Sequence, residues 1–264
     1  ADLEAIDAEL RRDVIEPSVV IGSRDKRLTL TDPSFVARDE QIMAMDAAIA
    51  RARAGAGGLI LLEGESGGGK TRLLEEVARR AAREGFWVLR GQGTNEVAQQ
   101  PFRVLDCIVE GIRATIRSKP ELATLLQSEL GDHQETLTSA LPALATALAK
   151  PDSTSAVTEE TGESRTIPSL IRFLDALGRA DQPALIILDD CQWADELTYK
   201  LIRRWHTEGI AVGGGQRHVF VVAAFRTEEV ADDNLLRKIP EAQALTLPPL
   251  KDAEVQQLVE SMAG

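Results

Sequence analysis

One segment of the chain combines glycines, a lysine and a threonine at a spacing suited to phosphate binding. The residues GESGGGKT, from Gly64 to Thr71, fit the pattern G-x-x-x-x-G-K-[ST]. Glycines permit positive φ angles, so successive backbone amides can point into one concavity. Lys70 is then placed to reach the β- and γ-phosphates of a nucleoside triphosphate, and the Thr71 hydroxyl to ligate magnesium. We therefore expect this loop to bind ATP with Mg²⁺. The backbone amides expected to bind phosphate are those of Ser66, Gly67, Gly68 and Gly69. Arg72, which follows Thr71, is a further candidate for contact with the nucleotide.

Two adjacent aspartates suit the other half of such a site. Asp189 and Asp190 end the apolar run ALIIL. Magnesium needs a carboxylate near it, and hydrolysis needs a group that orients the attacking water. Both belong at the carboxyl end of a parallel strand, where ligands collect in open α/β sheets. We assign Asp189 to the magnesium shell and Asp190 to water activation. Taken alone, the pair could equally end a strand and cap the next helix, but its combination with the loop favours the chemical role.

A third candidate is Arg226, which directly follows the apolar run HVFVVAAF. Its guanidinium could make charge-assisted hydrogen bonds to γ-phosphate oxygens. A strand-end arginine can equally face solvent. Spacing alone does not separate these two interpretations.

The elements around these residues alternate between short apolar runs and helical patterns. Continuous apolar runs are typical of parallel strands that are covered on both faces. Their alternation with helices indicates βαβ units and therefore an α/β fold with a mostly parallel sheet. The predicted strands are 59–64, 86–91, 183–190, 218–226 and 244–250. The predicted helices are 38–53, 71–85, 101–149, 169–180, 194–209 and 251–263. Between them, the polar stretch 151–164 is predicted to be a mobile loop.

Composition excludes several classes of protein. The chain has a net charge of −12, which argues against a nucleic-acid partner. No uncharged apolar run approaches the length of a membrane span, so we expect no membrane partner. Cys107 and Cys191 lack metal-ligand spacing, and we interpret them as buried thiols in a reducing, cytoplasmic setting.

Several segments, in order, resemble one family. They include LLEGESGGGKTRLLEE, LIILDDCQWADELT, VVAAFRTEEV and LTLPPL. Together they resemble the P-loop ATPase domain of the signal-transduction ATPases with numerous domains (STAND), a branch related to AAA+ proteins. The resemblance covers about residues 34–250. It implies a five-stranded parallel sheet of order 5-1-4-3-2 and a nucleotide-driven switch that regulates attached domains.

The resemblance also implies roles for single residues. Arg226 matches the family's sensor arginine, and Gly64 to Thr71 match its phosphate loop. Val36 and Arg38 match the entry motif beside the adenine, although Ala37 stands where the family has glycine. Trp193 and Asp195, which follow the family's Trp-Ala-Asp, are expected to pack and to cap a helix.

The expected organisation has three parts. Residues 1–33 are predicted to form a helix and linker, residues 34–250 the ATPase domain with a helical insertion at about 101–150, and residues 251–264 the start of a helical domain. The first ten residues resemble the last helix of bacterial Ser/Thr kinase domains. The chain begins at Ala1 and stops inside a predicted helix, so we expect it to be part of a longer, kinase-linked regulator.

Three functions stay open at this point. The leading hypothesis is a slow ATPase switch whose partners are ATP, ADP and the adjoining domains, with self-association driven by nucleotide as an option. The second is a nucleotide-binding scaffold that does not hydrolyse. The third, a small-molecule kinase, requires a lid with arginines, for which the helical region offers Arg103, Arg113 and Arg117.

Overall fold

The computed structural model of the chain describes residues 38–95, 100–148, 163–211 and 216–263. The expected N-terminal helix and linker, Val36 and the segment 151–162 lie outside the described residues.

Five strands form the centre of the compact unit Arg38–Pro249. They are β1 (Leu59–Gly64), β2 (Trp87–Gln92), β3 (Ala184–Asp189), β4 (Val219–Arg226) and β5 (Gln243–Leu247). The strand order is β2-β3-β4-β1-β5, and all four pairings are parallel. This is the expected order 5-1-4-3-2 counted from the opposite edge, so the predicted α/β fold is confirmed.

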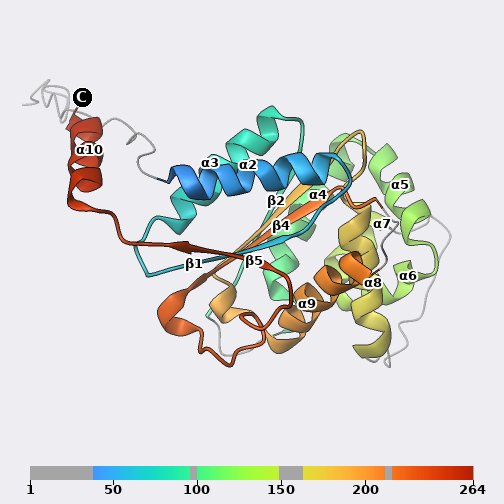
Figure 1. The fold of residues 1–264 in the computed structure, drawn as a ribbon. Coiled ribbons are helices and arrows are strands. Elements are labelled where there is room, and N and C mark those ends of the chain that lie inside the picture. The colour runs from blue at the N-terminus through green and yellow to red at the C-terminus, as the bar shows by residue number, and fades with distance from the viewer. Residues whose placement is uncertain (1–37, 96–99, 149–162, 212–215, 264) are drawn as a thin grey trace, which may run out of the picture. The chain divides into compact units, whose positions relative to one another are not determined.

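The apolar runs form strands because helices cover both faces of the sheet (Figure 1). Alternate side chains of a strand point to opposite faces. Leu59 and Leu61 of β1 belong to the large core cluster, which extends into the helices of the second half of the chain. Ile60 and Leu62 are equally buried and face the other way. On that side lie α2 (Asp39–Arg53) and α3 (Lys70–Arg83), whereas α8 (Glu163–Ala176) and α9 (Glu196–Ala211) lie on the cluster side.

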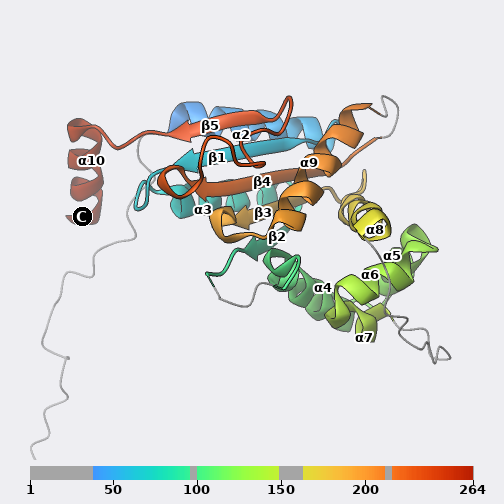
Figure 2. The same ribbon diagram turned by 90° about the horizontal axis from the view of Figure 1, so that it is seen from below.

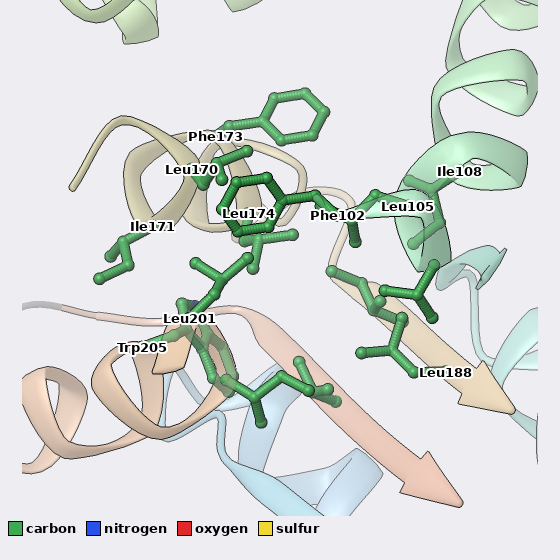
Figure 3. Close-up of a cluster of buried hydrophobic side chains, with 14 of the residues drawn as sticks. Phe102, Leu105, Ile108, Leu170, Ile171, Phe173, Leu174, Leu188, Leu201 and Trp205 are labelled. Carbon is green, nitrogen blue, oxygen red and sulfur yellow. The ribbon is translucent and has the colours of Figure 1, made fainter. Parts of the chain in front are cut away.

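The region predicted as a helical insertion consists of several short helices. They are α4 (Asp106–Ser118), α5 (Glu121–Leu130), α6 (His133–Ala140) and α7 (Ala145–Leu148), and Figure 2 shows them grouped beyond the β2 edge of the sheet. Side chains of α8 and α9 meet Phe102 and Leu105, at the start of this region, in the core cluster (Figure 3). This packing attaches the helical region to the sheet through apolar burial.

Two local expectations were wrong. Glu163 and Ser164 were expected in a loop and the next helix at Ser169, but α8 already begins at Glu163 and runs through Pro168. Proline disfavours a helix interior, so the pattern alone places the start after it. Cys191 is buried as expected, whereas Cys107 is exposed on α4, because it lies on the face of that helix opposite Ile108 and Ile112.

The last described element, α10 (Asp252–Ala263), belongs to a separate unit that includes Leu250–Gly264. Among the described residues, no helix combines the length and apolarity needed to cross a bilayer.

Candidate functional site

The glycine-rich loop joins the end of β1 to the first residue of α3. Gly67 and Gly69 have φ angles of +74° and +89°, which side chains other than glycine rarely adopt. Both glycines are exposed. Within the described residues their backbone N–H groups donate to no other group, as is usual before the first turn of a helix. The amide of Gly68 differs, because it donates to the Glu65 carbonyl at 3.0 Å. The loop thus presents amides at a positive helix end, the arrangement that binds phosphate.

Lys70 is buried beneath this loop, with 7% of its surface exposed. Its ammonium donates to the carbonyl oxygens of Gly64 and Glu65, at 2.8 and 2.9 Å. Burial lowers the pKa of Lys70, and nearby carboxylates, foremost Glu228, act in the opposite direction. An ammonium has three N–H donors, so one is left for a phosphate oxygen.

Thr71 and Asp189 meet at the start of α3 and the end of β3. The Thr71 hydroxyl donates to Asp189 Oδ2 at 3.3 Å, across 118 residues of sequence. The other carboxylate oxygen, Oδ1, accepts the Asp190 backbone N–H at 2.9 Å. Burial raises the pKa of Asp189, partly offset by this amide. A hydroxyl beside a carboxylate is a donor set that suits magnesium.

Asp190 is held by two glutamine side chains that the sequence analysis missed. Gln92 Nε2 donates to Oδ2 at 3.2 Å, and Gln192 Nε2 donates to Oδ1 at 2.9 Å. The backbone of Asp190 is left-handed, with φ +52°, and its carbonyl oxygen would be only 2.2 Å from a Cβ added to Gly93. Gln92 is the last residue of β2. Its position at the carboxyl end of a strand next to β3 is the signal that would have identified it.

Arg226 faces the acidic strand end. Its Nε lies 3.7 Å from Asp190 Oδ1, and its Nη1 pairs with Glu229 at 2.7 Å. The guanidinium also lies over the ring of Trp193, 4.9 Å from the ring centroid. Trp193 Nε1 donates to Glu229 at 3.0 Å, so this tryptophan orients polar groups in addition to packing. The hydrogen bond to Glu229 is the main reason that the pKa of Arg226 is raised.

The remaining candidates are less central. Arg38 is buried and donates from Nη2 to the Gly68 carbonyl at 3.3 Å, so it supports the loop from the side of α2. Arg72 pairs with Glu75 on its own helix at 3.2 Å. Asp195 caps α9 as expected, because its Oδ1 accepts the Thr198 N–H at 3.0 Å.

A third residue missed from the sequence is Glu228, in the turn Thr227–Glu229 after β4. Its Oε1 accepts the backbone N–H of Ser66 at 2.8 Å. Its own backbone amide and that of Ser66 lower the pKa of Glu228. One of the expected phosphate donors therefore binds a carboxylate of the same chain. The acidic pair that follows Arg226 was the available signal.

These residues fit a magnesium triphosphate. The loop supplies amides of Gly67 and Gly69 and one ammonium, and facing them are the Thr71–Asp189 pair and Asp190. Among the described residues there is no group of three or more His, Cys, Asp or Glu that could hold a metal ion. Magnesium is commonly bound by one or two carboxylates together with substrate phosphates and water, and the Thr71–Asp189 pair suits that binding mode.

Comparison with known proteins places this geometry in context. The sequence profile of the AAA ATPase domain matches residues 34–222. Among curated proteins, none matches significantly. The structure is similar to the crystal structure of Cdc6p from Pyrobaculum aerophilum, with 15% identity and a TM-score of 0.51, covering 88% of this chain and 52% of that one. It is also similar to ORC1 of Aeropyrum pernix, solved in complex with DNA, with 18% identity and a TM-score of 0.48, covering 89% and 52%. The chain thus spans about half the length of each. The likeness to Cdc6p shows the fold alone.

Proposed function

The chain belongs to the AAA ATPase domain family, and we propose that it binds Mg-ATP and hydrolyses it slowly, as a nucleotide-dependent switch in a larger signalling protein. The observation that carries this proposal is the 3.3 Å hydrogen bond from Thr71 to Asp189, which joins the phosphate loop to the acidic end of β3. A loop with no carboxylate beside it would bind phosphate without a means of holding magnesium.

Each residue has a distinct role in the proposed reaction. The amides of Gly67 and Gly69 and the third N–H of Lys70 hold phosphate oxygens, and Thr71 and Asp189 orient the magnesium shell. Magnesium, when bound, neutralises charge that develops on the phosphates.

The remaining two groups act on the attacking water and on the charge of the terminal phosphate. Asp190 accepts a proton from, or orients, the attacking water. Arg226, 3.7 Å from Asp190, is close enough to turn towards the terminal phosphate and stabilise its charge.

We further propose the setting of this activity. The resemblance to STAND ATPases supports a regulatory role with adjoining domains as partners, and the N-terminal resemblance supports a kinase-linked regulator. The domain limits 1–33, 34–250 and 251–264, nucleotide-dependent self-association and a cytoplasmic location belong to the same proposal. The net charge of −12 supports the absence of a nucleic-acid partner.

One observation favours the scaffold as a second candidate. Both groups proposed for hydrolysis are engaged by neighbours, Asp190 by Gln92 and Gln192, and Arg226 by Glu229. A site in which these contacts persist after ATP binds would hold nucleotide without cleaving it.

The test combines binding with turnover. Calorimetry should show heat with both Mg-ATP and Mg-ADP, and the protein should release phosphate from ATP. Asp190→Asn should keep Mg-ATP binding and lose phosphate release, because the amide cannot accept the proton. Asp132→Asn, an exposed position in the helical region, should change neither.

The outcomes separate the two candidates. Binding without phosphate release from the unmodified protein would support the scaffold. If neither nucleotide produced heat, both candidates would be excluded.

A further inference from the structure

One carboxylate of the chain accepts a hydrogen bond from a backbone amide of the phosphate loop. Glu228 Oε1 and Ser66 N are 2.8 Å apart, although 162 residues separate them in sequence. A carboxylate oxygen and a phosphate oxygen are both anionic acceptors and bind the same backbone donors. The contact therefore resembles the one that a phosphate would make.

The charges around Glu228 support this likeness. Among its neighbours, Lys70 and Arg226 both lower the pKa of Glu228, after the two backbone amides. Conversely, Glu228 is the carboxylate that raises the pKa of Lys70 most. One carboxylate thus accepts a hydrogen bond from a loop amide and interacts electrostatically with an ammonium and a guanidinium. The proposed function gives phosphate oxygens to Lys70 and the terminal phosphate to Arg226, so Glu228 interacts with two groups that would bind phosphate.

The position of Ser66 indicates which phosphate is affected. The α- and β-phosphates in loops of this type are held by amides next to the first turn of the helix, whereas the lysine also reaches the γ-phosphate. Ser66 lies on the strand side of the loop, four residues before Lys70. A diphosphate bound at the start of α3 leaves this amide to Glu228, and a triphosphate brings a second anion towards it.

The terminal phosphate and the Glu228 carboxylate would repel each other at the Ser66 N–H, because both are anions. Binding of the phosphate there therefore requires Glu228 to move away from Ser66. We propose that Glu228 is a specificity-determining residue that competes with the terminal phosphate for the phosphate loop, and so weakens binding of Mg-ATP relative to Mg-ADP. This inference rests on the proposed function, because it requires nucleotide at the loop.

Displacement of Glu228 would also change the contacts of Arg226. Glu228 lies in the same short turn as Glu229, which pairs with Arg226 and accepts from Trp193. A movement of the turn caused by the terminal phosphate would loosen Arg226 from Glu229. The contact therefore links the third phosphate to the release of a residue proposed for hydrolysis.

The test compares nucleotide affinities by calorimetry in the unmodified protein and in Glu228→Gln. Glutamine keeps the shape of the side chain and an acceptor oxygen but removes the charge. Mg-ATP binding should tighten by about tenfold, the worth of one charge-assisted hydrogen bond, while the affinity for Mg-ADP stays the same. Glu110→Gln, an exposed position on α4, is the matched control and should change neither affinity.

A second readout needs no nucleotide. In Glu228→Ala, hydrogen exchange at the Ser66 amide should be faster than in the unmodified protein, because its acceptor is gone. Unchanged exchange at Ser66, or an equal shift in the affinities for both nucleotides, would overturn the inference and leave the proposed function intact. If the unmodified protein gave no Lys70-dependent heat with either nucleotide, the proposed function would fall, and this inference with it.

Discussion

Replacing Lys70 by alanine should weaken Mg-ATP binding by a factor that follows from its contacts. Two of the three ammonium N–H groups bind the carbonyls of Gly64 and Glu65, at 2.8 and 2.9 Å. One donor is thus left for a phosphate oxygen. A hydrogen bond to a charged group is worth about 1.5–3 kcal/mol, which corresponds to about a ten- to 150-fold loss of affinity. The two loop carbonyls also lose their partner, which lowers the stability of the loop with and without nucleotide.

Calorimetry with Mg-ATP at constant ionic strength measures the change. Lys119→Ala removes an exposed lysine after α4 and should leave the affinity unchanged. Urea unfolding of Lys70→Ala without nucleotide separates a loss of binding from a loss of fold. A folded variant that loses less than about fivefold in affinity, about 1 kcal/mol, would refute the reasoning, because the ammonium would then make no phosphate bond.

Three further predictions concern residues that pack or hydrogen-bond around the candidate site. Asp195→Ala should lower the free energy of unfolding in urea by about 2–4 kcal/mol, because this carboxylate caps α9 and also accepts the half-buried backbone N–H of Phe102 at 2.9 Å. Burial raises the pKa of Tyr199, the only tyrosine of the chain, from 10.0 to about 12. Its contribution to stability is therefore complete below pH 10.0 and lost as the pH rises through about 12, a loss that Tyr199→Phe should abolish. Gly93→Ala should abolish phosphate release, because its Cβ would be 2.2 Å from the Asp190 carbonyl oxygen.

Each of these predictions has a result that would contradict it or a control variant. A loss below about 1 kcal/mol for Asp195→Ala would contradict the capping role, since one N-cap is typically worth that much. Titration of Tyr199 at its ordinary pKa, followed by tyrosinate absorbance, would contradict its burial. Gly111→Ala, where an added Cβ meets nothing within 4 Å, should raise stability by about 0.5–1 kcal/mol and leave phosphate release unchanged.

The sequence by itself determined the sheet and the position of the loop. Continuous apolar runs such as 59–64 and 183–190 have one stable solution in a chain that alternates them with helices, namely parallel strands covered on both faces. Because parallel strands end at the same edge, the Thr71–Asp189 contact follows from two local patterns. The limits of α8 did not follow, because packing in the core outweighed the local effect of Pro168.

Only the tertiary structure decided what surrounds these groups. The local sequence places Gln92 and Glu228 just after two predicted strands, but it does not name their partners, which lie 98 and 162 residues away. Arg226 was open between solvent and site until the fold brought it to Asp190 and Trp193. Backbone patterns act over a few residues and set which elements form, whereas side-chain partners depend on which strand ends and loops become neighbours.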